Sequence, residues 1–162
     1  MSIVAGRIDY RLLHGIVQSF WCPTYATKRT MIIDDAVAND EVRKAAMKMS
    51  KPSGQALSII NHETAYTNFK AGKYDGHTVF VIARDPQTFL DLIEQGQKVP
   101  VLTLGLTELP TDDTPGVQAG RRAFIKEEDI PVYQKIAAAG TRVEVRYMTT
   151  DKPVPISEYI PM

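Results

Sequence analysis

The side chains with the clearest chemical potential lie near the N-terminus, in residues 7–15, which read Arg-Ile-Asp-Tyr-Arg-Leu-Leu-His-Gly. This stretch brings His14, Asp9, Arg7 and Arg11 within eight positions. An imidazole is a nucleophile, and guanidinium groups with free N–H groups at a helix start hold a phosphoryl group that carries close to two negative charges. A hydrogen bond from one ring nitrogen of His14 to Asp9 would fix the tautomer and leave the other nitrogen free to attack. The alternative is an ordinary surface or capping histidine.

The charge of the chain favours a local anion site. Lys plus Arg and Asp plus Glu balance at 19 each, so binding to nucleic acid or anionic lipid would gain little from counterion release. The first thirty residues nevertheless hold four basic residues against one aspartate. At an effective dielectric near 20, one ion pair at 4 Å is worth about 4 kcal/mol, against roughly 0.3–1 kcal/mol for a helix end. We therefore expect Arg11 to matter more than the helix dipole, and we expect no nucleic-acid partner.

Other sites have weaker support in the sequence. Asp34 and Asp35 could bind a metal, act as a base or repel anions, but backbone N–H groups of the next turn would satisfy them equally well. The segment that starts at His62 has Tyr66 where a zinc-protease helix requires its second histidine, and the single Cys22 excludes a disulfide and a Cys-based metal site. The glycine-rich motifs that bind nucleoside triphosphates and dinucleotides are absent. We therefore expect no metal and no cofactor.

Short apolar runs without alternation predict strands that are covered on both faces, and segments with helical periodicity separate them. The predicted strands are Ile3–Ala5, Met31–Ile33, Leu57–Ile60, Val79–Ala83, Val101–Leu104 and Ala123–Ile125, and the alternating run Val143–Met148 predicts an edge strand. Alternation of strand and helix predicts an α/β fold with an open, mostly parallel sheet of about seven strands and helices on both faces. The first predicted helix packs through Leu13, Ile16, Val17 and Phe20, and a second through Val42, Ala45, Ala46 and Met49.

Length and composition predict one domain over residues 1–162, with an extended, proline-containing C-terminal arm over about 151–162. The connection from Leu106 to Arg121 has no periodicity, and loops of that length are more often functional than incidental. No apolar run approaches 18 residues and no secretory signal is evident, so we expect a cytoplasmic protein. Ligand sites of open parallel sheets lie beyond the carboxyl ends of the strands, which singles out residues 7–15, 34–35 and 105–107.

Residues 7–15, followed by Ile-Ile-Asp-Asp-Ala-Val-Ala-Asn-Asp at 32–40, resemble the IIB component of the mannose/fructose/sorbose family of the bacterial sugar phosphotransferase system. The likeness runs in register from the first strand to the last, and the string Arg-x-Asp-x-Arg-Leu-x-His-Gly is specific. The resemblance implies a cytoplasmic phosphocarrier, peripherally associated with a membrane transporter. In that reading His14 takes a phosphoryl group from a phosphohistidine of the IIA component and passes it to a sugar delivered by the membrane-embedded IIC and IID components.

The resemblance also implies roles for the neighbouring residues. Arg11 would contact the phosphoryl group and Asp9 would orient the imidazole, with Arg7 and Gly15 binding or orienting alongside them. Asp34 and Gly105 would line the rim. Because transfer between two proteins calls for a shallow, partly apolar rim, we also assign Tyr10 and Ile16 to it.

This sequence departs from the family pattern at three places. The family usually has an acidic residue at the position of Tyr10, Gln at that of Ile16, and an Asn-containing Gly motif near residues 104–106. These departures suggest a first alternative, a regulatory or binding paralogue that no longer transfers phosphate. A second alternative is a generic phosphate-binding domain of the same architecture.

Overall fold

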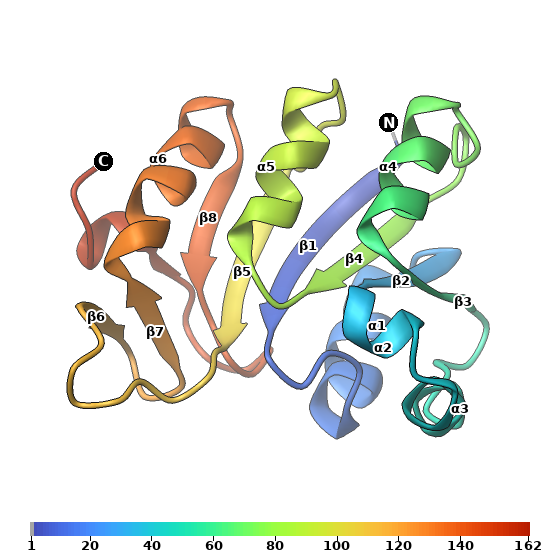
Figure 1. The fold of residues 1–162 in the computed structure, drawn as a ribbon, viewed down its shortest axis with the longest axis horizontal. Helices are drawn as coiled ribbons and strands as arrows, with labels where there is room; N and C mark the ends of the chain where they lie inside the picture. Colours follow the sequence, from blue (N-terminus) through green and yellow to red (C-terminus); the bar gives the residue numbers. More distant parts are fainter. Residues whose placement is uncertain (1) are drawn as a thin grey trace.

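The computed structural model describes residues 2–162, which form a seven-stranded sheet with helices on both faces (Figure 1). The strands of this sheet are β1 (Ile3–Asp9), β2 (Arg29–Ile33), β3 (Ala56–Ile60), β4 (Val79–Ala83), β5 (Val101–Leu106), β8 (Arg142–Val145) and β9 (Val154–Pro155). Their order is β3-β2-β4-β1-β5-β8-β9, and every neighbouring pair is parallel except β8 and β9. The predicted fold class is therefore confirmed.

The two faces of the sheet carry separate hydrophobic cores. One core packs under α4 (His62–Lys70), α5 (Pro86–Glu94) and α6 (Ile130–Ala138), which lie side by side across the front of Figure 1. The other packs under η1 (Val17–Trp21), α1 (Cys22–Tyr25) and α2 (Asp35–Ala38). The central strands β1, β2 and β4 contribute to both cores, which explains why their sequences are apolar without alternation. None of the helices described in residues 2–162 is long and apolar enough to span a bilayer.

The sequence pattern predicts Ala123–Ile125 as a strand of the parallel sheet, but this run does not join that sheet. It lies in β7 (Ala123–Lys126), which pairs antiparallel with β6 (Gly116–Ala119) in a separate hairpin. The turn between them uses Gly120 at φ +74°, a conformation that glycine adopts without strain. The long connection after β5 is thus partly structured, and its hairpin leads through η2 (Glu127–Asp129) into α6.

The C-terminal segment packs on the domain instead of extending away from it. Strand β9 pairs with β8, so β8 is not the edge of the sheet, and a short helix η3 (Ile156–Glu158) follows. Ile156 and Ile160 are buried in the core beneath α6 and the hairpin. Burial of these two apolar side chains explains why the proline-containing tail is ordered.

Two predicted helix faces differ from the observed ones. The first helical segment contains the π-turn η1, and Trp21 is buried there while Phe20 is 46% exposed. A π-turn inserts one residue into the helical repeat, so the core-facing position moves from Phe20 to Trp21. Helix α3 (Glu41–Lys48) buries no residue, and Val42 at 80% and Met49 at 89% are exposed.

Candidate functional site

His14 and Asp9 form the centre of the site beyond the carboxyl end of β1. The Nε2 atom of His14 lies 2.9 Å from both carboxylate oxygens of Asp9, whose side chain is fully buried. A carboxylate accepts hydrogen bonds and does not donate them, so Nε2 carries the proton and Nδ1 presents its lone pair. The arrangement therefore prepares one ring nitrogen, Nδ1, for nucleophilic chemistry.

Access to Nδ1 decides whether this chemistry is available. The side chain of His14 is only 8% exposed, so most of the ring is shielded from solvent. Among the described residues, Nδ1 makes no hydrogen bond, yet it is not one of the fully buried polar side-chain atoms without a partner. Nδ1 therefore keeps contact with solvent while the other side of the ring is packed against Asp9.

Arg7 supports Asp9 from beneath and does not reach the surface. Its Nε donates to Asp9 Oδ2 at 3.1 Å, and its two terminal nitrogens donate to the backbone carbonyls of Arg146 and Tyr147, both at 3.2 Å. Burial lowers the pKa of the Arg7 guanidinium, and the charge of Asp9 opposes that shift. Because all three contacts are internal, Arg7 orients Asp9 and has no nitrogen left for an incoming anion at the surface.

The loop after β1 is shaped by hydrogen bonds to Asp9 and by one strained residue. Asp9 Oδ1 accepts from the backbone N–H of Arg11 at 3.0 Å, and the Asp9 carbonyl accepts from Leu12 at 3.1 Å. Leu12 is fully buried and has φ +60°, a left-handed conformation that costs a non-glycine residue roughly 1 kcal/mol or more. This turn returns the chain so that His14, five residues after Asp9, faces the Asp9 carboxylate.

Helical structure begins at Gly15, directly after His14, and runs to Tyr25. The His14 carbonyl accepts from the N–H of Gln18 at 2.9 Å, so the N–H groups of residues 15–17 form the open first turn. Gly15 is exposed, and a Cβ placed there would meet nothing within 4 Å. The space around the Cα atom of Gly15, next to His14 in the chain, is therefore open.

Arg11 differs from Arg7 in being exposed. Within residues 2–162, its guanidinium makes neither an ion pair nor a hydrogen bond. It is therefore a cation, three residues from His14 in the sequence, that an incoming anion can engage without breaking an existing contact.

The residues expected at the rim differ in their exposure to solvent. Tyr10 is 42% exposed and its ring lies under the guanidinium of Arg84, at 5.3 Å, while Ile16 is half-buried. Asp34 is buried and caps α2 by accepting from the N–H of Val37 at 3.0 Å, which matches the structural alternative for this carboxylate. Tyr10 thus lies on the surface, and Asp34 mainly holds a helix start.

Gly105, also expected at the rim, lies beneath it. A Cβ at Gly105 would overlap the guanidinium of Arg7. The glycine therefore makes room for the guanidinium of the arginine that supports Asp9.

Gly105→Ala is expected to destabilise the fold by about 1–3 kcal/mol, because the added methyl group must displace a fully buried guanidinium. Gly15→Ala is the matched control, since its Cβ enters open space. Urea unfolding of both variants measures the difference. Equal stability of Gly105→Ala and the parent chain would contradict the packing described for Arg7.

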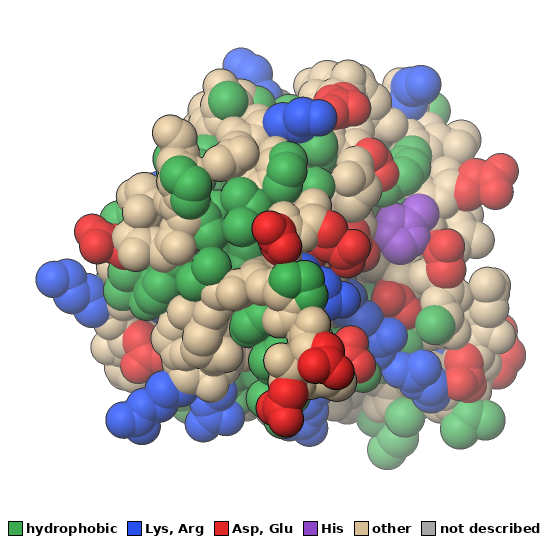
Figure 2. Space-filling view, turned by 60° about the vertical axis from the view of Figure 1, so that its left-hand side comes forward, with side chains coloured by type: hydrophobic (Ala, Val, Ile, Leu, Met, Phe, Trp, Pro, Cys, Tyr) green, Lys and Arg blue, Asp and Glu red, His purple; other side chains and the backbone are tan. Residues whose placement is uncertain are grey.

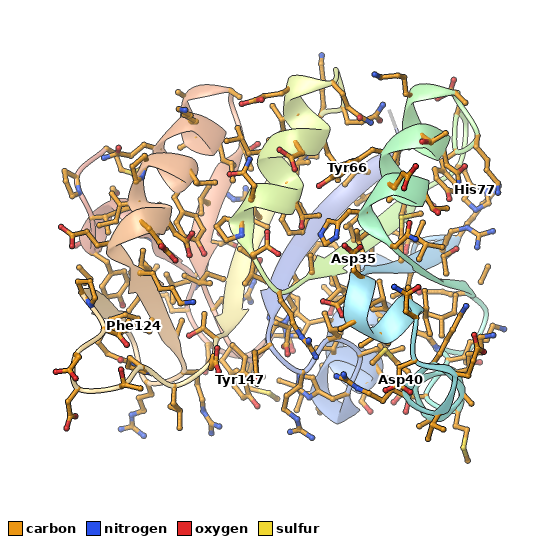
Figure 3. All side chains as sticks on the ribbon, in the orientation of Figure 1. Asp35, Asp40, Tyr66, His77, Phe124 and Tyr147 are labelled. Atoms are coloured by element: carbon orange, nitrogen blue, oxygen red, sulfur yellow. The ribbon has the colours of Figure 1, made fainter. Side chains whose placement is uncertain are left out.

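Three residues of this site carry no signal in the sequence analysis. The Trp21 indole N–H donates to the Tyr147 carbonyl at 2.8 Å, and the guanidinium groups of Arg7 and Arg146 lie over the Trp21 ring at 4.9 and 5.3 Å. Figure 3 shows Tyr147 just beyond the carboxyl ends of β1 and β5. The contacts of Trp21 with Arg146 and Tyr147 join residues more than 120 positions apart in the sequence, so the local spacing of residues does not predict them.

Two other candidate residues, Asp35 and His62, contact each other and do not contact His14. His62 Nδ1 lies 2.8 Å from Asp35 Oδ1, and His62 Nε2 lies 2.8 Å from the hydroxyl of Thr88. Hydrogen bonds from His62 lower the pKa of the exposed Asp35 carboxyl. The described residues contain no group of three or more His, Cys, Asp or Glu side chains that could hold a metal ion.

Comparison with known proteins gives a consistent assignment. The family model described as "PTS system sorbose subfamily IIB component" matches residues 3–161. The sorbose-specific EIIB component of Klebsiella pneumoniae is 28% identical over 99% of this chain and 96% of its own length. The mannose-specific EIIAB component of Escherichia coli is 28% identical over 99% of this chain and 49% of its own length.

A solved structure supports the same assignment. The IIBSor domain of the sorbose permease from Klebsiella pneumoniae superposes with a TM-score of 0.86 at 27% identity, covering 98% of this chain and 95% of that domain. The match therefore includes the sheet, both layers of helices and the packed C-terminal segment. This chain belongs to the sorbose subfamily of IIB components and has a phosphocarrier role in a sugar phosphotransferase system.

Proposed function

We propose that His14 is the phosphoryl acceptor, and that it receives the group at Nδ1 from a phosphohistidine of a IIA component. The phosphoryl group then passes to a sugar delivered by membrane-embedded IIC and IID components. The observation that carries this proposal is the pairing of His14 Nε2 with the buried Asp9 carboxylate, which leaves Nδ1 as the ring nitrogen with a free lone pair.

The first transfer exchanges one P–N bond for another. The Nδ1 lone pair attacks phosphorus, the bond from phosphorus to the donor imidazole breaks, and the bonding electrons return to the donor ring. Because the Nε2 proton stays on His14, its ring becomes positively charged as the new bond forms, and the Asp9 carboxylate 2.9 Å away stabilises that charge. In the second transfer a P–O bond to a sugar hydroxyl replaces the P–N bond, the hydroxyl proton is released, and His14 returns to its neutral form.

The residues around His14 divide between binding and orientation. Arg11 and the N–H groups of the helix start at Gly15 hold the phosphoryl oxygens, since a guanidinium makes short, charge-assisted hydrogen bonds to phosphate. Arg7 acts through Asp9 and touches no phosphoryl oxygen. Positioning and charge stabilisation are the main demands of phosphoryl transfer, and these side chains can supply both.

The relatives support the choice of partners. The name of the Escherichia coli relative joins an A and a B component, and this chain covers 49% of that protein, which agrees with a IIA donor. The exposed Tyr10 and the half-buried Ile16 belong to the rim that the donor contacts. The place of action is the cytoplasm, at the inner face of the membrane transporter.

Arg11→Ala is expected to slow phosphoryl transfer to His14 on the order of 100-fold while leaving the fold intact. The reason is that the exposed guanidinium binds the charge of the moving group and makes no contact that the fold requires. Arg142→Ala is the control, because Arg142 lies at the amino end of the parallel strand β8, whereas His14 lies beyond the carboxyl end of β1. Rapid-quench measurement of labelled phosphate gives both rates, and an unchanged rate in Arg11→Ala would remove Arg11 from the site.

The proposed acceptor is tested by incubating the chain with phosphorylated IIA and following the label. We expect acid-labile phosphate on the parent chain and none on His14→Gln, while His62→Gln and His77→Gln keep full labelling. Undiminished label on His14→Gln would exclude His14 as the acceptor. Binding of IIA to the parent chain without any label would instead indicate a regulatory paralogue that no longer transfers phosphate.

A further inference from the structure

A cavity lies on the face of the sheet opposite the helical segment that follows His14. Its volume is about 800 Å³, and it lies between the starts of α5 and α6, the segment after β5 and the hairpin strand β7. Ile8 and Tyr10 at the end of β1 form part of its wall, but His14 does not. The strands β1 and β4 are neighbours in the sheet, but the helical segments that follow them cover opposite faces. Open α/β sheets bind ligands in the crevice between two such strands, beyond their carboxyl ends.

The lining of this cavity is more acidic than the rest of the protein. It holds five carboxylates and two cationic side chains, in a chain whose net charge is zero. Figure 2, which brings the α6 side of the molecule forward, shows acidic side chains gathered near the middle of this face beside hydrophobic ones. The acidic residues are Asp85, Glu108, Glu127, Glu128 and Asp129.

Asp129 is the partly buried carboxylate among them that lacks a partner. Within residues 2–162 its side chain makes no hydrogen bond and no ion pair, and although Asp129 occupies the N-cap position of α6, it does not cap the helix. Burial and the neighbouring charges of Glu128 and Asp85 raise the pKa of its carboxyl, against the opposing charge of Lys126. Asp85 has one oxygen engaged by Thr88, at 3.0 and 3.2 Å, and makes no further bond within the described chain.

Tyr133 gives an independent sign of an unfilled site. The residue is only 2% exposed and lines the cavity, yet its hydroxyl makes no hydrogen bond to any residue among 2–162. The hydroxyl is also not among the fully buried polar atoms without a partner, so the small exposed part of Tyr133 includes it. Burial and the charges of Asp129 and Asp85 raise the pKa of this phenol. It therefore remains neutral, with a lone pair that can accept a hydrogen bond from a ligand.

We propose that this cavity binds a small molecule that carries a protonated primary amine on a compact apolar body. The ammonium group donates to the Asp129 carboxylate, to the free oxygen of Asp85 and to the Tyr133 hydroxyl, which together match its three N–H donors. The apolar body packs against Phe124, Pro86 and Ile8. The volume is within the usual range for small-molecule sites, and the acidic lining disfavours phosphates and other anions.

Titration of the full chain with benzylamine, followed by NMR, tests this proposal. Benzyl alcohol is the matched probe, because it has nearly the same shape without the positive charge. We expect benzylamine to shift signals of residues that line the cavity, and benzyl alcohol to bind at least tenfold more weakly. Equal binding of the two probes, or benzylamine shifts confined to other surfaces, would overturn the proposal.

Variants of the chain separate this site from the phosphocarrier site. Asp129→Asn is expected to weaken benzylamine binding at least tenfold, and Tyr133→Phe severalfold, while both remain folded because neither group supports a structural contact. His14→Gln is expected to bind benzylamine as the parent does, so this result is independent of phosphoryl transfer. Unchanged benzylamine affinity in folded Asp129→Asn would refute the assignment.

Discussion

Asp9→Asn is expected to lower the rate of phosphoryl transfer to His14 by about 10²–10⁴-fold. The substitution keeps the size of the side chain but adds an amide N–H that can donate to His14 Nε2. The ring then carries its proton on Nδ1, where the lone pair is needed for attack. The variant also loses the negative charge that stabilises the ring as the P–N bond forms.

Asp34→Asn is the control for this substitution. Asp34 follows the carboxyl end of β2, which β4 separates from β1, and it caps α2, a role that asparagine fills as well as aspartate. Its transfer rate should therefore stay within a fewfold of the parent rate. Rapid-quench kinetics on folded protein, checked by circular dichroism, gives both rates. A parent-like rate in folded Asp9→Asn would show that Asp9 does not set the tautomer of His14.

Arg7→Met is expected to destabilise the protein by about 3–5 kcal/mol, because it leaves the carboxylate of Asp9 buried without its cationic partner. Both side chains of this pair are fully buried, so solvent cannot compensate for the lost charge. Methionine fills much of the same volume, so most of the effect is electrostatic. The carbonyls of Arg146 and Tyr147 also lose their donors.

Arg121→Met provides the comparison, since Arg121 is exposed in the turn of the β6–β7 hairpin. Surface substitutions of this kind usually change stability by less than about 0.5 kcal/mol. Urea unfolding of the parent and both variants measures the free energies of unfolding. If Arg7→Met were as stable as Arg121→Met, the buried pair would not hold the site together.

The central sheet could be predicted from the sequence because its strands are buried on both faces and therefore form short, uninterrupted apolar runs. Ala123–Ile125 is equally apolar but pairs with β6 in a hairpin, where Ala123 and Ile125 point into the core without joining the parallel sheet. Local pattern identifies a strand, whereas its partner is decided by long-range contacts. The packing of the C-terminal tail was not predicted for the same reason. Its prolines suggest an extended arm, whereas the contacts of Ile156 and Ile160 with the core depend on residues distant in the sequence.

The part of the candidate site that lies in one short segment, residues 7–15, was predictable from the sequence. Asp9 and His14 are five residues apart, and the structure brings their side chains into contact. The division of labour between Arg7 and Arg11 was not predictable, because two arginines four positions apart look equivalent in sequence. Only the fold shows that Arg7 continues the buried strand β1, whereas Arg11 lies in the exposed turn.

Gly105 shows why a rim residue can be misplaced by sequence reasoning. It lies near the carboxyl end of β5, at the edge of the sheet where ligands bind, but the close approach of the Arg7 guanidinium explains why the residue is a glycine. The same holds for Trp21, whose place beside Arg7 depends on the π-turn in the first helix. Both residues act through the packing around Asp9, a property of the assembled site.

The ring nitrogen of His14 that carries the phosphate can be identified in solution. Phosphorylated chain labelled with ¹⁵N-histidine can be examined by NMR, where phosphorus couples to the nitrogen that carries it. We expect phosphate on Nδ1 of His14, with Nε2 still protonated and hydrogen-bonded to Asp9. Phosphate on Nε2, or on another residue, would show that Nδ1 of His14 is not the acceptor.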